Sequence, residues 1–502
     1  MTNRDAFSVT DKNHTYAPSL LLGQEKGFAP SVHKPVSMLL IYPNTYYVGM
    51  SNLGFQAIYY HANQHPSIFC DRGFVYKSRP VSGILSGISL RSFDIAAFSA
   101  SFELDYFNIV SALRESGLNP DRTQRKDTDP LILIGGIAPT INPLPLAGIA
   151  DAIVIGDGEM VLNDLLNACI QGKTRSGRDV LDSLSVLSGV FVPETHKCAN
   201  PVMRLQALDL DLFPAQTHVF TAETEFSGRF LIEVGRGCGR KCRFCAADYI
   251  YPRPRWRSAE SIISAISWSR QFTDKVGMLG VAVMNHPDID DIIRQVQSWN
   301  MDISISSLRV EAIKESVLDM ITASGQRSVT LAPETGSDSL RKTINKRFTN
   351  DRLLSLVQTL QNVGVQELKL YFMAGLPGET DADIEAIISL CKDISARNIR
   401  LKVNVNPFIP KPHTPFEREP MMPQKELKRI FSYLQSEFRA IPRSSFSHAS
   451  IREAYTEALI CRADENMGNE ILLNASARVP KELAGLAPDA PLPWKIVHIP
   501  LS

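Results

Sequence analysis

Three closely spaced cysteines are the residues whose types and spacing most clearly indicate chemistry. Cys238, Cys242 and Cys245 follow the pattern C-x3-C-x2-C and come directly after an apolar run, Phe230–Val234. That run predicts a strand, so the cysteines are expected on the loop that leaves its carboxyl end. Three thiolates on so short a loop can face one point and bind a metal centre.

Two metal centres are compatible with this spacing. A [4Fe–4S] cube bound by only three cysteines leaves one iron without a protein ligand, whereas electron-transfer clusters use four cysteines. An iron with an open position can bind a substrate, as a catalytic zinc ion with an open position does. The alternative is a structural zinc site whose fourth ligand is a histidine such as His286 or His413. Motifs elsewhere on the chain are needed to choose between them.

The aromatic Phe244 immediately before the third cysteine makes the loop resemble the signature of the radical S-adenosylmethionine (SAM) superfamily. The resemblance implies that Cys238, Cys242 and Cys245 hold a [4Fe–4S] cluster and that SAM chelates the open iron. One electron from the cluster then cleaves SAM to a 5′-deoxyadenosyl radical. A one-electron donor such as flavodoxin or ferredoxin is implied as a partner, while the catalytic residues and the substrate stay unknown.

The composition is that of a globular chain. Its 502 residues exceed one ordinary core, so two or three domains are expected. Lysine and arginine number 53, as do aspartate and glutamate, and a formal charge of zero gives no electrostatic case for a nucleic-acid binder. No run is long enough to cross a membrane, and no secretory signal is recognised. The other cysteines are scattered, which favours a reducing cytoplasm.

Residues 36–195 alternate apolar strands with helices. The expected strands are Met38–Tyr42, Phe93–Ser99, Leu131–Ile134 and Asp151–Ile155, and the expected helices are Phe55–Asn63, Phe107–Glu115 and Met160–Cys169. This alternation predicts an α/β fold with a doubly wound, Rossmann-like parallel sheet, which binds ligands beyond the carboxyl ends of its strands. Residues 1–35 lack a pattern and are interpreted as a tail or a docking strap.

Small and polar residues follow these strands where such a ligand would bind. The region resembles the cobalamin (B12)-binding domain that precedes the radical SAM domain in one subfamily. The resemblance implies corrinoid contacts from Ser99, Ser101, Gly135, Gly136, Gly156, Gly158 and Glu159. The Asp-x-His-x-x-Gly motif, whose histidine ligates cobalt in domains of the methionine-synthase type, is absent. The alternative is a lobe without cobalamin that has a structural or substrate-docking role.

A second βα pattern begins at Arg229, after a connector of residues 196–228. Its expected strands are Phe230–Val234, Val276–Val283, Ile303–Ser307, Ser328–Ala332, Glu367–Ala374 and Leu401–Pro407. The expected helices are Ala259–Phe272, Asp288–Trp299, Glu311–Ser324, Ser337–Val363 and Ala382–Asn398. Six βα units predict a partial (β/α)6 TIM barrel over residues 229–415, with its chemistry at the carboxyl ends of the strands. Residues 416–502 are expected to form a small helical extension that packs on this barrel.

Residues at the ends of these strands are the candidates for SAM contacts. The resemblance assigns this role to Phe244, Gly280, Ser306, Arg309, Glu334, Gly375 and Gly378. Glu334 can accept hydrogen bonds from the hydroxyls or the ammonium group of SAM, and Arg309 can pair with its carboxylate. The alternative is an ion pair between Arg309 and Glu334 inside the mouth of the barrel.

Together these resemblances imply an enzyme that abstracts hydrogen from an unactivated carbon and, with a corrinoid, transfers a methyl group to it. Three alternatives stay open: a methylthiolating or RNA-modifying radical SAM enzyme, the same fold without corrinoid in a rearrangement or cyclisation, and a non-enzymatic cluster or cobalamin sensor. Basic residues near the cysteines, with Tyr249, Tyr251 and Trp256 among them, are compatible with an RNA substrate. They can equally balance the charge of an anionic cluster.

Overall fold

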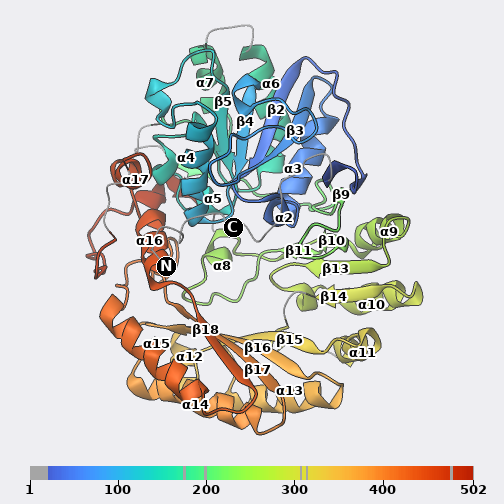
Figure 1. Ribbon diagram of the computed structural model, residues 1–502, viewed down its shortest axis with the longest axis vertical. Coiled ribbons are helices and arrows are strands. Elements are labelled where there is room, and N and C mark those ends of the chain that lie inside the picture. Colours follow the sequence, from blue (N-terminus) through green and yellow to red (C-terminus); the bar gives the residue numbers. More distant parts are fainter. Residues whose placement is uncertain are drawn as a thin grey trace.

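The computed structural model describes residues 21–172, 177–196, 201–305, 308–311, 315–474 and 479–500. Two lobes lie one above the other in Figure 1, with the helices near the C-terminus along one side of both. No helix among the described residues is both long and apolar enough to cross a lipid bilayer.

The N-terminal lobe contains one six-stranded sheet of order β3-β2-β4-β5-β6-β7. Its strands are β2 (Val36–Tyr42), β3 (Ile68–Phe74), β4 (Ile95–Ser99), β5 (Leu131–Gly135), β6 (Ala152–Val154) and β7 (Val190–Phe191). All neighbouring pairs are parallel except β6 and β7. The predicted doubly wound sheet is thus confirmed. Because the strand order reverses between β2 and β4, their carboxyl ends form the switch point where such sheets bind ligands.

Helices cover both faces of this sheet. They are α3 (Leu53–Gln64), α4 (Tyr106–Glu115), α5 (Ile137–Ile141), α6 (Leu162–Gly172) and α7 (Gly177–Ser185). Successive residues of β2 point to opposite faces, so Leu39 and Ile41 join one apolar core while Met38 and Leu40 join the other. Both faces of the sheet are therefore buried, and only the ends of its strands remain for binding a ligand.

Part of the predicted N-terminal tail docks on this lobe. The short strand β1 (Lys26–Gly27) pairs with β9 (Val219–Phe220), which lies in the predicted connector. Glu25 accepts two hydrogen bonds from the guanidinium group of buried Arg72, at 2.8 and 2.7 Å. Residues 21–28 therefore act as a strap across the first lobe.

The second lobe contains two parallel sheets. One has the order β10-β13-β14 and the other β15-β16-β17-β18. The strands are β10 (Phe230–Glu233), β13 (Lys275–Leu279), β14 (Asp302–Ile305), β15 (Ser328–Glu334), β16 (Glu367–Ala374), β17 (Arg400–Pro407) and β18 (Ser444–His448). Among the described residues, β14 and β15 do not pair as strands. Of the residues that the structure describes here, Leu308 N donates a backbone hydrogen bond of 3.4 Å to Thr330 O on β15.

These strands share one apolar core, and helices cover them on the outside (Figure 1). The helices are α9 (Ala259–Ser269), α10 (Ile289–Ser298), α11 (Glu315–Ser324), α12 (Asp338–Thr343), α13 (Asn350–Asn362), α14 (Asp381–Ser395) and α15 (Gln424–Phe438). The six predicted strands are present, but Val276–Val283 ends at Leu279. A single continuous barrel sheet is not seen in the described part of the chain.

The predicted single helix Ser337–Val363 is wrong, because two helices, α12 and α13, occupy it. Asn345 between them has a positive φ of 58°, a conformation that ends a helix. Thr349 then caps α13, its hydroxyl accepting a hydrogen bond from Arg352 N. Because of this break, residues 344–349 form a loop between the two helices.

The predicted C-terminal extension is divided between the two lobes. β18 pairs with β17 and so extends the second sheet of the barrel lobe. In contrast, α16 (Ile451–Cys461) and α17 (Glu465–Leu472) contribute Ile460, Ile471 and Leu472 to an apolar core of the N-terminal lobe. β19 (Val497–His498) pairs with β8 (Val202–Met203) beside the same lobe. α16 also contributes Ala454, Tyr455 and Ala458 to the core of the barrel lobe, so it packs on both lobes. The expectation that the whole region packs on the barrel is therefore wrong for α17 and β19.

A buried carboxylate connects the lobes. Asp157, which follows β6 and is 2% exposed, accepts hydrogen bonds from Arg236 at 2.6 Å and from Arg255 at 2.7 Å. The two arginines lie on the hairpin of β11 (Gly235–Arg236) and β12 (Arg255–Trp256). Since Arg236 is two residues before Cys238, this contact fixes the start of the cysteine loop relative to the N-terminal lobe.

Candidate metal centre and cofactor cavity

The cysteine loop begins directly after β10 and β11, as predicted. Gly237 at its start has a φ of 90°, and a Cβ there would lie 2.4 Å from the carbonyl oxygen of Arg253. Only glycine fits this close backbone approach. The loop ends where α8 (Ala246–Ile250) begins, one residue after Cys245.

Hydrogen bonds from the segment between α12 and α13 hold the cysteine loop in place. The Asn345 side-chain amide donates hydrogen bonds to the carbonyl oxygens of Arg240 and Lys241, at 3.1 and 2.9 Å. The backbone N–H of Arg243 donates to the carbonyl oxygen of Ile344 at 3.1 Å. The segment between α12 and α13 therefore sets the conformation of the loop between its first and second cysteines.

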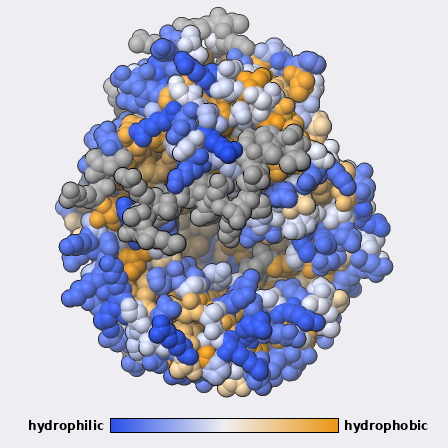
Figure 2. Space-filling view, in the orientation of Figure 1, coloured by the Kyte–Doolittle hydropathy of each residue, from blue (hydrophilic) through white to orange (hydrophobic). Residues whose placement is uncertain are grey.

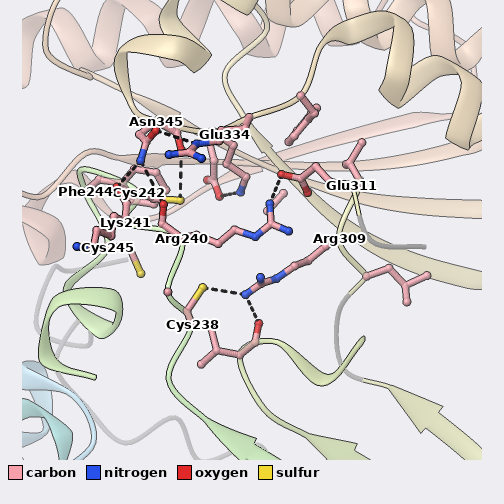
Figure 3. Close-up of a pocket in the computed structure, with 18 of the residues that line it drawn as sticks. Cys238, Arg240, Lys241, Cys242, Phe244, Cys245, Arg309, Glu311, Glu334 and Asn345 are labelled. Atoms are coloured by element: carbon pink, nitrogen blue, oxygen red, sulfur yellow. Dashed lines mark hydrogen bonds and ion pairs between the residues drawn. The ribbon is translucent and has the colours of Figure 1, made fainter. Parts of the chain in front are cut away.

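All three cysteines line one cavity of about 440 Å³ (Figure 3). Burial raises the pKa of Cys242 to about 11 and also raises the pKa of Cys245. The Cys242 and Cys245 thiols are therefore protonated at neutral pH in the metal-free protein. Because a metal binds the thiolate, loading this site releases protons.

Neither histidine of the zinc alternative lines the cavity of the three cysteines. Among the described residues, no three His, Cys, Asp or Glu side chains lie close enough together to hold one metal ion. The two histidines proposed as a fourth ligand are used elsewhere: His286 Nε2 is 2.8 Å from the carbonyl oxygen of Arg257, and His413 Nε2 is 2.9 Å from that of Ile141.

Arg309 lies against the first cysteine and not against Glu334. Its Nη2 atom is 2.9 Å from the Cys238 Sγ atom and 2.6 Å from the carbonyl oxygen of Val281. Its Nη1 atom is buried without a partner among the described residues. Glu334 instead pairs with Lys346 at 2.7 Å. The alternative of an Arg309–Glu334 ion pair is therefore wrong, and a guanidinium N–H group remains available to a ligand (Figure 3).

The predicted SAM residues divide into three groups. Phe244, Arg309 and Glu334 line the cavity, whereas Gly280, Gly375 and Gly378 do not. Ser306 lies outside the described residues. The Gly375 N–H donates to Glu379 Oε2 at 2.6 Å, and burial raises the pKa of Glu379 to about 7. That turn is therefore shaped by a carboxyl group from its own chain segment.

Other cavity residues were not predicted. They come from four places: the basic side of the cysteine loop, the residues that follow β14, strand β15, and the segment between α12 and α13. They include Arg240, Leu308, Glu311, Thr330, Asn345, Lys346 and Phe348. Arg240 and Glu311 form an ion pair of 2.5 Å across the cavity wall (Figure 3). The capping sequence that begins at Thr349 is the signal that would have placed residues 345–348 in a loop.

The predicted corrinoid residues make several contacts within the protein. A Cβ on Gly136 would lie 2.2 Å from the carbonyl oxygen of Ala100, and one on Gly156 would lie 2.3 Å from that of Leu205. Glu159 pairs with Arg236 at 2.8 Å. These glycines thus permit close backbone packing. The Ser101 hydroxyl accepts a hydrogen bond of 3.2 Å from Asn52, which places it at the switch point. Ser99 and Gly135 lie at the ends of β4 and β5 as expected, and Gly158 begins the short 3₁₀ turn Gly158–Met160 that follows β6.

Exposed apolar side chains gather at the same edge of this sheet. Tyr47 is 38% exposed, Val48 37%, Phe102 63% and Met160 45%. Tyr47 and Val48 lie on α2 (Tyr46–Gly49) after β2, Phe102 follows β4, and Met160 follows β6. In Figure 1 this edge of the N-terminal lobe faces the barrel lobe. The strand ends thus present an apolar surface toward the cysteine loop.

Comparisons with known proteins cover both lobes. The family described as "Radical SAM proteins, N-terminal" matches residues 54–193, and that described as "Radical SAM superfamily" matches residues 232–391. An uncharacterized protein of Methanocaldococcus jannaschii is 26% identical over 441 residues, which cover 86% of this chain and 89% of that protein. A Pyrococcus horikoshii protein, named an uncharacterized methyltransferase, is 23% identical over 317 residues, covering 60% of this chain and 67% of its own length.

A solved structure shares the fold. TsrM from Kitasatospora setae, a radical S-adenosylmethionine methyltransferase with cobalamin and a [4Fe–4S] cluster bound, has a TM-score of 0.54 at 14% identity. The similarity covers 76% of this chain and 77% of that chain. This chain therefore shares its overall fold with that protein.

Proposed function

We propose, since this chain belongs to the radical SAM superfamily, that its three loop cysteines hold a [4Fe–4S] cluster and that SAM binds in the adjoining cavity. When bound, the cluster supplies the electron that cleaves SAM to a 5′-deoxyadenosyl radical. The observation that carries the proposal is that Cys238, Cys242 and Cys245 open on one cavity of about 440 Å³. That volume is within the range of small-molecule sites, about 300–1,000 Å³.

The residues around this cavity fit the two ends of a zwitterionic ligand. The buried Nη1 atom of Arg309 has no partner among the described residues and can donate to a carboxylate. Glu334, held by Lys346, can accept from an ammonium or a hydroxyl group. Phe244, Leu308 and Phe348 supply apolar walls that exclude water from the reacting atoms.

We further propose that the N-terminal lobe binds a corrinoid and that the reaction is methyl transfer to an unactivated carbon. Support comes from the apolar side chains at the switch point, among them Phe102 and Met160, and from the fold shared with TsrM. The glycine turns fit this role less well, since Gly136 and Gly156 pack on protein backbone. A corrinoid would therefore lie on the apolar edge, between the strand ends and the cysteine loop.

The cluster and SAM proposal predicts turnover without any partner protein. Anaerobically reconstituted protein, given SAM and dithionite, is expected to form 5′-deoxyadenosine, which chromatography with mass detection measures. Fully clustered protein that forms none would favour a sensor in place of an enzyme.

The corrinoid proposal predicts retained cobalamin. After incubation with hydroxocobalamin and gel filtration, the protein is expected to keep a base-off cobalamin spectrum, because the sequence lacks the cobalt-ligating histidine motif. Replacing Phe102 with aspartate is expected to reduce the retained fraction by about tenfold, since it places a charge on an apolar contact. A matched change at another exposed apolar residue, Leu212→Asp at a side chain that is 67% exposed, serves as the control. No retained absorbance in the wild type would leave a radical SAM enzyme without corrinoid.

Arg309 is expected to set the reduction potential of the cluster. Its N–H group and positive charge lie 2.9 Å from the Cys238 sulfur and stabilise the more negative, reduced state. A charge-assisted hydrogen bond contributes about 1.5–3 kcal/mol, so Arg309→Gln should lower the one-electron potential by roughly 60–130 mV. An EPR-monitored redox titration measures the shift, with Arg439→Gln, at an exposed position outside the cavity, as the control. An unchanged potential would show that Arg309 does not act on the cluster.

A further inference from the structure

The second sheet of the barrel lobe has two faces of opposite character. Along β16 and β17, buried apolar side chains alternate with more exposed ones, so each kind occupies its own face. Leu370, Phe372 and Val403 belong to the apolar core that this sheet forms with the outer helices. We call the opposite face of β15, β16 and β17 the inner face. Its exposed side chains on β16 and β17 are Lys369, Tyr371, Arg400 and Lys402.

The inner face continues one wall of the cavity that the three cysteines line. Thr330 and Ala332 of β15 line that cavity. In the parallel register of the sheet, Thr330 lies opposite Lys369, and Lys369 lies opposite Lys402. Paired residues of neighbouring strands point to the same face of a sheet. Lys369 is therefore one strand away from the cavity wall, and Tyr371 lies two residues closer to the carboxyl ends of the strands.

The inner face is exposed, whereas the corresponding face of the first sheet is covered. There Leu231 of β10 packs with Leu53 and Ala57 of α3, which belongs to the N-terminal lobe. On the inner face, Tyr371 is 40% exposed and the Lys402 side chain is 54% exposed. In a closed (β/α)8 barrel, layers of branched apolar side chains fill this position. The exposed polar side chains here are therefore available to a ligand and do not form a core.

The exposed side chains give the inner face an excess of positive charge. Glu367 pairs with Lys402 at 2.9 Å and with Arg400 at 3.7 Å, so one carboxylate balances two cations. In the part of the chain that the structure describes, no carboxylate pairs with Lys369, and no other aromatic ring packs against Tyr371. A cation without a counterion beside an open aromatic ring fits a ligand that has a negative group and a planar part.

We propose that the inner face binds the substrate and that this substrate is a small aromatic anion. Its carboxylate or phosphate contacts Lys369, and its ring lies on Tyr371. The inference rests on the proposed function, which gives the adjoining cavity to SAM. Residues two apart on a strand are separated by about 7 Å, so a ligand held at both side chains extends along the strands. The end of the ligand farthest from the anionic group thus points toward the carboxyl ends of the strands and the cysteine loop.

Other classes of substrate fit this part of the molecule less well. Hydrophilic side chains predominate on the face of the barrel lobe that Figure 2 shows, which does not favour a lipid. Single-stranded RNA needs open aromatic faces on which bases stack. Near the cysteine loop, however, the Arg204 and Arg255 guanidinium carbons lie 5.3 and 5.5 Å from the ring centre of Tyr251. The Trp256 ring packs against the His286 ring at 5.5 Å. Both rings are thus engaged within the protein.

The test measures the binding of three naphthalene probes that differ in charge. Equilibrium dialysis follows 2-naphthyl phosphate, 2-naphthoate and neutral 2-naphthol on anaerobically reconstituted protein, with SAM present to fill the adjoining cavity. Lys369→Gln removes the cation, and Lys369→Arg keeps it. Lys425→Gln, at an exposed position on α15, is the charge-matched control. Tyr371→Ala is compared with Tyr433→Ala, a change at another tyrosine that is 38% exposed.

Wild-type protein is expected to bind both anions at least about tenfold more tightly than naphthol, and Lys369→Gln should remove this preference while Lys369→Arg keeps it. The preference should be smaller at high salt. Tyr371→Ala should weaken all three probes by about fivefold or more, because each loses its ring contact. Both control variants should bind like the wild type. The ratio between the two anions tells whether the site prefers phosphate or carboxylate.

Three results would overturn the inference. The first is naphthol binding as tightly as the anions, or no binding of any probe. The second is an anion preference that survives Lys369→Gln. The third is displacement of both anions by micromolar tRNA, which would assign the inner face to RNA. In contrast, wild-type protein that binds the anions but forms no 5′-deoxyadenosine with dithionite would refute the proposed function and leave the anion site in place.

Discussion

Replacing Cys242 with alanine is expected to abolish 5′-deoxyadenosine formation. The proposed cluster has three protein ligands, and the middle one lies on the part of the loop that Asn345 and Ile344 hold. Loss of an outer-shell partner of a metal ligand already costs about 10–100-fold, so loss of a direct ligand should exceed this range. The measurement combines iron and sulfide content with the yield of 5′-deoxyadenosine after anaerobic reconstitution.

A second cysteine provides the matched control. Cys391 is fully buried in α14, within the apolar core of the barrel lobe, and burial raises its pKa well above the ordinary value. Cys391→Ala should therefore keep its iron content and its rate, with a modest loss of stability from the small cavity left behind. A Cys242→Ala protein that kept a SAM-responsive cluster would contradict the proposed ligand set.

Replacing Asp157 with alanine is expected to lower the free energy of unfolding by about 3–5 kcal/mol, the cost of leaving a buried charge without its partner. Asp157 is 2% exposed and bonds two arginines, Arg236 and Arg255. Arg255 would lose its carboxylate partner in the junction between the lobes, whereas Arg236 would keep Glu159 and Glu233. Urea unfolding measures the change. Glu159→Gln, which affects only one contact to Arg236, is expected to cost about 1 kcal/mol.

The Asp157 contribution depends on pH in a defined direction. Burial acts to raise the pKa of Asp157, but the charges of Arg236 and Arg255 outweigh it and hold that pKa below its ordinary value. A carboxyl group with a lowered native pKa stabilises the fold above its unfolded pKa of about 4 and loses that effect as the pH falls through the native value. Asp157→Asn should therefore cost most at neutral pH and progressively less below about pH 4. A cost that is independent of pH would assign the effect to packing.

The strands of both lobes could be predicted wherever apolar residues run together. β2, β5, β16 and β17 begin and end within two residues of their predicted bounds. β3 was missed because its central residues, Asp71 and Arg72, are charged yet buried. Their partners are distant in sequence: Glu25 bonds Arg72, and the Ser86 hydroxyl donates to Asp71 at 2.7 Å. A buried charged strand becomes recognisable only when those tertiary contacts are known.

The metal ligands of the candidate site could be proposed from the sequence, but much of the cavity wall could not. Cys238, Cys242 and Cys245 lie close together on the chain, so their spacing alone predicted a metal site. Asn345 and Lys346 are a hundred residues away and were hidden inside an expected helix. Helix-spaced apolar positions continue across Ile344 and Phe348, although both residues pack inward from a loop. Periodicity therefore favoured one helix where capping at Thr349 favoured two.

The distribution of the C-terminal elements has a consequence for synthesis on the ribosome. The N-terminal lobe emerges first, yet its core includes Ile460, Ile471, Ile496 and Val497 from the far end of the chain. Nascent chains fold domain by domain only when each domain carries its own apolar residues. The first lobe must therefore wait, with part of its interior exposed, until the barrel lobe has been translated. Chaperone demand during translation should accordingly be greatest for this lobe, and expressing it as an isolated fragment should give aggregated material.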